Sequence, residues 1–139
     1  MGHSVRVSTL RVIGHWLGPH EPNWPDVLDF VDPDASAVGR KILAVRLESA
    51  PRTDRAYMGY STCRICGCLN GNGEFTDGTF VWPEGLAHYV GAHNVVLPRD
   101  VEESLMSADI PPTETIDWAI SGDESCRDYE WWRSVAVDD

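Results

Sequence analysis

The first regular pattern of hydrophobic and polar positions lies near the N-terminus. Residues 5–13 read VRVSTLRVI, in which β-branched and polar residues partly alternate, so we expect a β-strand. The alternation changes phase between Val7 and Leu10, which indicates a bulge near Ser8. Residues 14–26 contain three prolines, two glycines and two tryptophans, and this composition predicts an ordered loop packed by its own aromatic side chains.

A helical period follows this loop. Residues 26–31 are expected to form a short helical turn whose apolar residues face inward, namely Val27, Leu28 and Phe30. Residues 33–48 are expected to form a longer amphipathic helix, with Asp32 as its N-cap and Pro33 in its first position. Its expected buried side consists of residues at i, i+4 and i+7, namely Val38, Ile42 and Val45. A strand over residues 42–47 is the competing prediction.

The middle of the chain contains a strong hairpin pattern. Residues 49–55 are typical of a polar turn, and residues 56–62 predict a strand. Asp77 and Gly78 then separate two β-prone runs, and Asp-Gly is a preferred hairpin turn because both residue types tolerate positive φ. A helix over residues 83–93 is expected to follow, with a proline in its first turn.

Two further segments complete the pattern. Residues 99–107 predict a short acidic helix with Val101 and Leu105 on its apolar side. The tail, residues 113–139, is acidic and contains three tryptophans, which together are too apolar to be left in water. We therefore expect the tail to be ordered against the body of the protein or a partner, with a helix over residues 124–135.

The charge of the chain narrows the range of partners. Acidic residues outnumber basic ones 22 to 11, which gives a formal net charge of −11. This charge repels phosphate backbones and anionic membranes, so we expect a basic protein partner and neither nucleic acid nor a membrane. Charge that only keeps the protein in solution is the alternative. No long apolar run or signal-peptide pattern is present, so a cytoplasmic location is expected.

Residues suited to a metal ion lie on both sides of the expected hairpin. Cys63 and Cys66 are separated by two residues, so a tight turn can aim both thiolates at one point. His88 and His93 follow with four residues between them, a spacing that zinc sites allow. These four residues are predicted to hold Zn²⁺. Residues five apart do not share a face of a regular helix, so we expect the helix to tighten or end near Gly91.

The other cysteines leave alternatives open. Cys68 could replace one histidine in a Cys₃His site, support the site by hydrogen bonding, or be a small buried residue. Cys126 is expected to be an isolated buried cysteine, and an iron–sulfur site formed by all four cysteines is the alternative. A metal-free core in which both histidines are only hydrogen-bonded is a further alternative. His15 and His20 are expected to be surface or loop-packing residues.

A closed set of four protein ligands favours a structural zinc and a non-enzymatic role. It leaves no coordination position for an activated water, and the chain has no His-Glu-x-x-His arrangement. The alternative is a small zinc-dependent hydrolase, in which His88, the two cysteines and a water bind the metal and Glu74 or Glu84 acts as the base.

Together these patterns predict an α+β fold in a small single domain over residues 1–139. At its centre we expect a zinc-finger-like element over residues 60–98, made of the Cys-x2-Cys turn, a β-hairpin and a helix. A chain of this length can bury its own core, so the metal would organise only one part of the fold.

The same stretch resembles a signature of small, uncharacterised bacterial proteins. In that signature a Cys-x2-Cys-Gly and an Asn-Gly precede a TDG turn and a WPEGLAHYV helix, which is followed by His and Leu-Pro. The similarity extends back to Trp24-Pro25-Asp26 and to FVDP at residues 30–33. The resemblance implies a shared fold and a shared metal site over residues 24–98, and it implies no activity.

We therefore expect a zinc-binding protein-interaction module that binds a basic partner, such as an immunity or antitoxin protein against a basic nuclease, or an adaptor. Nucleic-acid binding through the finger-like element is disfavoured. The helix expected over residues 83–93 contains no Lys or Arg to contact phosphates or bases.

Overall fold

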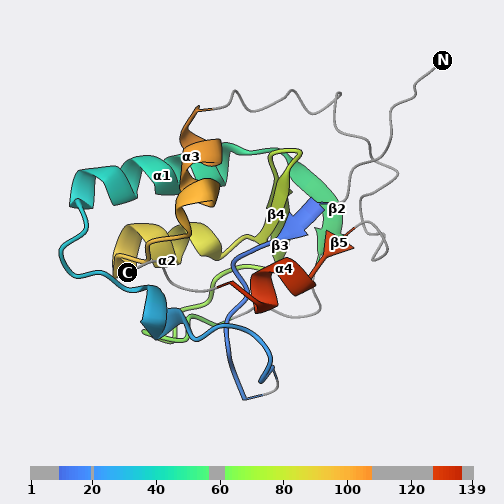
Figure 1. Cartoon of the computed structure of the whole chain (residues 1–139), viewed down its shortest axis with the longest axis horizontal. Helices are drawn as coiled ribbons and strands as arrows, with labels where there is room; N and C mark the ends of the chain where they lie inside the picture. The colour runs from blue at the N-terminus through green and yellow to red at the C-terminus, as the bar shows by residue number, and fades with distance from the viewer. Residues whose placement is uncertain (1–9, 20, 57–61, 108–126, 136–139) are drawn as a thin grey trace.

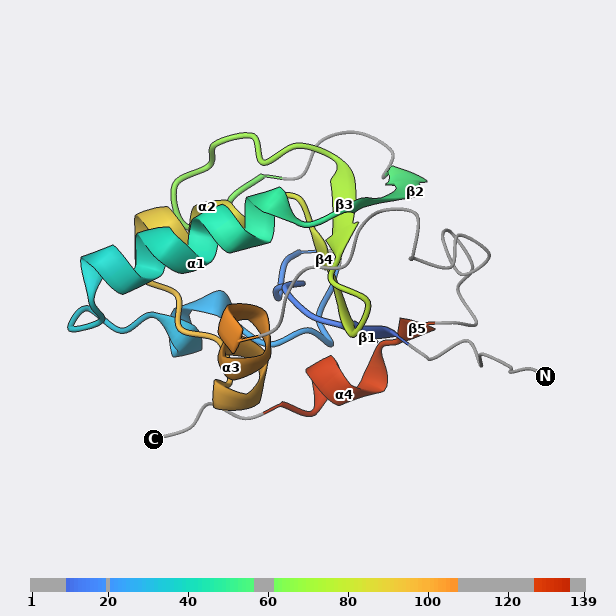
Figure 2. The ribbon, with the colours of Figure 1, turned by 90° about the horizontal axis from the view of Figure 1, so that it is seen from above.

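A mixed β-sheet forms the centre of this computed structural model, which describes residues 10–19, 21–56, 62–107 and 127–135. Within these residues the sheet has five strands in the order β2-β3-β4-β1-β5 (Figure 1). Helices α1 and α2 lie side by side next to the sheet, and α4 lies beside β1 (Figure 2). The α+β class expected from the sequence is confirmed.

Parallel and antiparallel pairs are combined in this sheet. Its strands are β1 (Leu10–Val12), β2 (Arg52–Ala56), β3 (Gly73–Thr76), β4 (Phe80–Pro83) and β5 (Arg127–Asp128). β1 runs parallel to β4 and β5, whereas β3 runs antiparallel to β2 and β4. β1 confirms the end of the strand expected near the N-terminus. Residues 5–9, with the expected bulge, lie outside the described residues.

The predicted hairpin connects β3 and β4. Gly78 has a φ of 91°, as the Asp-Gly pattern requires, but Asp77 does not take a positive φ. Its carboxylate instead accepts hydrogen bonds from the backbone N–H groups of Thr79 and Phe80, at 2.9 and 2.8 Å. The side chain of Asp77 therefore stabilises the turn through local hydrogen bonds.

The polar turn expected over residues 49–55 is wrong from Arg52 onward, where β2 begins. Arg52 pairs with Phe75 of β3, and its guanidinium lies 4.7 Å from the centre of the Phe75 ring. This cation–π contact stabilises a charged residue on a β-strand. The composition of residues 49–55 did not predict the contact, because Phe75 is distant in the sequence. Residues 57–61, most of the next expected strand, lie outside the described residues.

The helices follow the predicted order. They are the 3₁₀ helix η1 (Val27–Phe30), α1 (Ala37–Ser49), α2 (Leu86–His93), α3 (Arg99–Ser107) and α4 (Glu130–Arg133). In η1, Val27 and Phe30 are buried as expected, but Leu28 is 64% exposed, so its inward placement was wrong. A 3₁₀ turn brings residues three apart onto one side, which separates Leu28 from that pair. In α3, Val101 and Leu105 are buried, as predicted.

Helix α1 begins later than the sequence pattern predicted. The N-cap is Ser36, whose Oγ accepts a hydrogen bond from the backbone N–H of Gly39 at 3.1 Å. Asp32, the predicted cap, instead accepts from the backbone N–H of Asp34 at 2.9 Å in the preceding turn. Both residue types are good caps, and the path of the chain determines which one the helix uses.

The predicted buried side of α1 was also wrong. Leu43 and Leu47 are buried against the rest of the protein. The expected core residues form an α1 apolar stripe that is instead exposed, with Val38 at 69%, Ile42 at 47% and Val45 at 60%. The two sets lie on opposite sides of the helix at 100° per residue, so the sequence period fits either one. Packing against α2 and α3 selects the leucine side.

The described part of the C-terminal tail is packed against the protein. Trp132 is fully buried, and its indole Nε1 donates a hydrogen bond to the backbone oxygen of His15 at 2.7 Å. Trp131 packs against the same core, so the expected ordering of the tail is confirmed for these two residues. Residues 113–126, which include Trp118 and the start of the expected tail helix, lie outside the described residues.

Apolar side chains cover the centre of the sheet on both faces. Leu10, Val12 and Val81 form one cluster, whereas Phe80 and Trp82, which point to the other face of β4, belong to the main core. Burial on both faces explains why β4 is a continuous apolar run. Among the described residues, no helix has the length and apolar character needed to cross a membrane.

Candidate metal centre

A tight turn places Cys63 and Cys66 on the loop that leads to β3. The backbone N–H of Cys63 donates to the oxygen of Cys68 at 2.8 Å, and the N–H of Gly67 donates back to the oxygen of Cys63 at 2.9 Å. Gly67 has a φ of 81°, a conformation that favours glycine over other residues. We call this turn, residues 62–69, the cysteine knuckle.

The knuckle surrounds the sulfur of Cys63 with hydrogen-bond donors. The backbone N–H groups of Ile65 and Cys66 both lie 3.4 Å from Cys63 Sγ. Cys63 is 4% exposed, whereas Cys66 is exposed. Amide donors directed at a sulfur stabilise the thiolate, which is the form that binds a metal.

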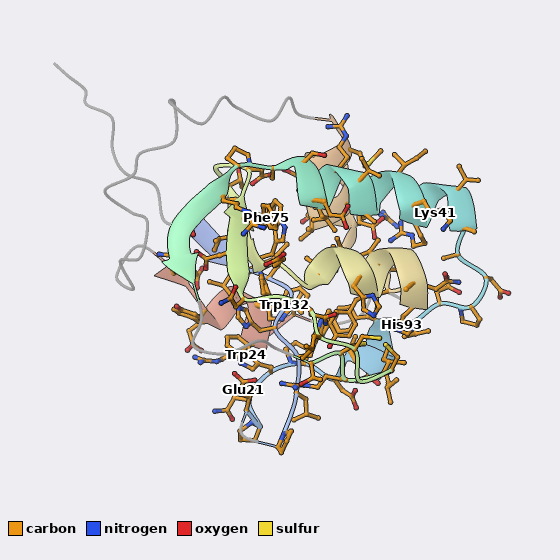
Figure 3. The ribbon with its side chains drawn as sticks, turned by 180° about the vertical axis from the view of Figure 1, so that it is seen from behind. Glu21, Trp24, Lys41, Phe75, His93 and Trp132 are labelled. Atoms are coloured by element: carbon orange, nitrogen blue, oxygen red, sulfur yellow. The ribbon has the colours of Figure 1, made fainter. Side chains whose placement is uncertain are left out.

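The two histidines come from α2, which ends at His93 (Figure 3). The Nε2 atoms of His88 and His93 are 3.2 Å apart, and the Nε2 atom of His88 is 3.4 Å from the Sγ atom of Cys66. The next residue, Asn94, ends the helix with a φ of 54°, and its backbone N–H donates to the oxygen of Tyr89. A position at the last residue of the helix lets the His93 ring turn back toward His88.

The helix was expected to tighten or end near Gly91, and it ends two residues later, at His93. Helix α2 continues through Gly91 to His93. A Cβ atom at Gly91 would lie 3.1 Å from the Cβ atom of Ala44 in α1, closer than most real contacts. Gly91 therefore permits the close approach of α1 and α2. The long imidazole side chains meet without a break in the helix.

All four predicted ligands converge on one point. Donor atoms of Cys63, Cys66, His88 and His93 all lie within 4.8 Å of one another. For Zn–N bonds of about 2.0–2.1 Å and Zn–S bonds of about 2.3 Å, the edges of a ligand tetrahedron are about 3.3–3.8 Å long. The measured separations of 3.2 and 3.4 Å are close to such edges. The four residues lie close enough to bind a metal ion.

The surroundings of His93 favour the protonation state that binds a metal. Burial, followed by the neighbouring His88, lowers the pKa of His93 below its ordinary value of 6.5, so its imidazole is neutral at neutral pH. Burial raises the pKa of Tyr89, the residue after His88, to about 12, so its hydroxyl keeps its proton. Neutral imidazole is the form of histidine that coordinates a metal.

Cys68 lies outside this group of four. It is exposed, so the alternative of a small buried residue is wrong, and its backbone oxygen accepts the Cys63 N–H. Its thiol does not belong to the group of four converging donors. Cys126 and His20 lie outside the described residues. His15 stacks on Trp24 with ring centres 5.1 Å apart, which confirms a loop-packing role.

The two carboxylates considered as catalytic bases are engaged in the hairpin region. Glu74 is buried, pairs with Arg127 at 2.6 Å and accepts a hydrogen bond from the Thr53 hydroxyl at 2.6 Å. Glu84 accepts from the backbone N–H of Gly73 at 3.0 Å and lies 3.4 Å from Arg52. Each carboxylate is therefore held by charge-assisted hydrogen bonds.

Sequence reasoning missed the contact between Tyr89 and the knuckle. The backbone N–H of Arg64 donates a hydrogen bond to the Tyr89 hydroxyl at 2.7 Å. The adjacency of Tyr89 to His88 is visible in the sequence, but the approach of residues 25 apart depends on the tertiary fold.

Comparisons of the chain with protein-family models, with curated proteins and with solved structures find no match.

Proposed function

We propose that Cys63, Cys66, His88 and His93 bind one structural Zn²⁺ ion that joins the cysteine knuckle to α2. The observation that carries this proposal is the convergence of two sulfur and two nitrogen donors within 4.8 Å. Two thiolates and two imidazoles form a donor set that zinc prefers, and four protein ligands complete a tetrahedron. Bound zinc contributes folding free energy because the site does not exist in the unfolded chain.

Elemental analysis of the purified protein tests the zinc centre directly. We expect one zinc per chain in the wild type, loss of zinc in Cys66→Ser and His93→Gln, and a full zinc content in the control Cys68→Ser. The first two variants should also melt at a lower temperature, because they lose the folding free energy of the metal. Wild-type protein without zinc, or zinc retained in Cys66→Ser and His93→Gln, would contradict the assignment.

A structural role for the metal is favoured over a small hydrolase. Glu74 pairs with Arg127, and Glu84 is hydrogen-bonded to Gly73, so both proposed bases already have partners. The spectrum of the Co²⁺-substituted protein separates the two roles. A four-coordinate spectrum without bound water supports the structural ion, whereas a five-coordinate or water-bearing spectrum supports catalysis.

We further propose that the zinc-stabilised protein is a cytoplasmic interaction module for a basic protein partner. Its formal net charge of −11 favours association with positive surfaces through long-range attraction. The α1 apolar stripe supplies side chains that an interface could bury.

Affinity capture at low ionic strength, followed by elution with increasing salt, tests this second proposal. We expect the retained protein to be rich in Lys and Arg and to elute as salt screens the attraction. An acidic partner, binding that salt does not weaken, or no retained protein would contradict it.

A further inference from the structure

Tyr89 is fixed beside the candidate metal centre by aromatic packing. It is 4% exposed, and its ring makes an edge contact with Trp16 at a centre-to-centre distance of 5.8 Å. His88 precedes Tyr89 in α2 and His93 follows it. The centres of their rings lie 6.1 and 6.4 Å from the centre of the Tyr89 ring. The direction of its hydroxyl is therefore set by the core and by α2, independently of a metal.

That hydroxyl contacts the knuckle next to Cys63. It accepts the backbone N–H of Arg64 at 2.7 Å, which is short for a neutral N–H···O hydrogen bond. Cys63, the residue before Arg64, helps to raise the pKa of this hydroxyl, so its side chain lies within interaction range of it. A phenol has one hydrogen and can accept at the same time as it donates, so the Arg64 amide occupies its lone pair and leaves its O–H for the sulfur.

The two cysteines consequently differ in environment. Cys63 is buried, and the amide nitrogens of Ile65 and Cys66 each lie 3.4 Å from its Sγ atom. Cys66 is exposed and its sulfur contacts His88. Hydrogen-bond donors beside a metal-binding sulfur fix its orientation and tune its charge, and the buried Cys63 sulfur has such donors on the knuckle.

We propose that Tyr89 is a positioning residue of the metal centre, whose hydroxyl donates to the Cys63 thiolate and accepts from the Arg64 amide. It links the knuckle, which carries the cysteines, to α2, which carries the histidines. This role rests on the proposed zinc centre. Hydrogen-bond partners of metal ligands fix ligand orientation and tune the charge of the donor atom, and losing one typically lowers metal affinity about 10–100-fold.

The test compares Tyr89→Phe with the wild type after substitution with Co²⁺. Phenylalanine keeps the ring and its packing and removes only the hydroxyl. We expect one Co²⁺ per chain in both proteins, a shift of the thiolate-to-cobalt charge-transfer band to lower energy in the variant, and about 10-fold weaker binding in competition with a chelator. The control Tyr129→Phe removes a hydroxyl from a ring that packs near Trp24, and it should change neither quantity.

Spectra are recorded with excess Co²⁺, which favours the folded form of a weakened variant, and circular dichroism confirms the fold. An unchanged charge-transfer band in folded Tyr89→Phe would overturn the role of Tyr89 even if the variant melted at a lower temperature. Wild-type protein that takes up no Co²⁺ would overturn the metal centre itself. The two failures are therefore distinguishable.

Discussion

At the scale of single residues, the four proposed ligands differ in how the protein holds them. Cys63 is buried and its sulfur accepts hydrogen bonds from two backbone amides, whereas Cys66 is exposed. His88 contacts both Cys66 and His93 and therefore lies at the centre of the group. Burial and the neighbouring His88 lower the pKa of His93. The stability of the metal-free protein should therefore depend on pH through this residue.

Acid should destabilise the metal-free protein through His93. The folded protein lowers the pKa of His93 below 6.5, so on acidification the unfolded chain takes up a proton first. The free energy of unfolding should therefore fall as the pH drops from 6.5 toward the folded pKa, and it should not change through this group above 6.5. Urea unfolding of chelator-treated protein over a pH series measures this dependence.

The control for this prediction is His93→Gln, which removes the titrating group. Its unfolding free energy should fall less over the same acidic range than that of the wild type. If wild type and variant had the same slope against pH, His93 would not be the group responsible. In the zinc-loaded protein, release of the metal adds to the acid effect, because protons compete with zinc for imidazole.

At the scale of elements, a buried ion pair joins strands that are distant in the chain. Glu74 in β3 pairs with Arg127 in β5 at 2.6 Å, with side-chain exposures of 2% and 0%. Arg127 lies beside β1 in the sheet, because β5 pairs with β1 at Leu10. The pair therefore connects the hairpin that precedes α2 to the C-terminal segment that carries Trp132.

Replacing Glu74 with glutamine should lower the free energy of unfolding by about 3 kcal/mol, because it leaves the buried Arg127 charge without a counter-charge. The same substitution at Glu130, which pairs with Arg133 and has an 82% exposed side chain, is the matched control. That exposed pair should contribute at most about 0.5 kcal/mol. Equal effects in urea unfolding would show that burial does not strengthen the Glu74 pair.

At the scale of the whole molecule, two properties underlie the proposed interaction with a basic partner. The formal net charge of −11 acts at long range, whereas the α1 apolar stripe acts only on contact. The stripe lies on the side of α1 opposite the buried Leu43 and Leu47. The proposed metal centre stabilises the region on which α1 packs, since α1 and α2 are in contact.

Ile42→Ser tests the stripe without disturbing the core. Because Ile42 is 47% exposed, we expect its replacement to change the free energy of unfolding by no more than about 1 kcal/mol. The variant should nevertheless bind the captured basic partner more weakly, as measured by titration calorimetry. Unchanged affinity would remove α1 from the interface, and a large loss of stability would show that Ile42 belongs to the core.

Much of the fold is visible in short-range patterns. The Asp77-Gly78 turn, the buried pair Val101 and Leu105, and the four candidate ligands could be picked out from the sequence because each depends on neighbouring residues or on spacing. The side of α1 that is buried could not be predicted, since aliphatic residues lie on two opposite sides of that helix. The role of Gly91 was missed for a related reason, because a glycine that breaks a helix and one that admits a neighbouring helix look alike in sequence.

By itself, the sequence determined which residue types could bind a metal, the hairpin between them and the acidic net charge of the chain, because these follow from local chemistry and composition. Only the tertiary structure decided that the donor atoms of Cys63, Cys66, His88 and His93 converge and that Cys68 lies apart. It also decided that Tyr89 meets the knuckle. Such contacts join segments far apart in the chain, and their geometry depends on how α2 packs against α1 and the sheet.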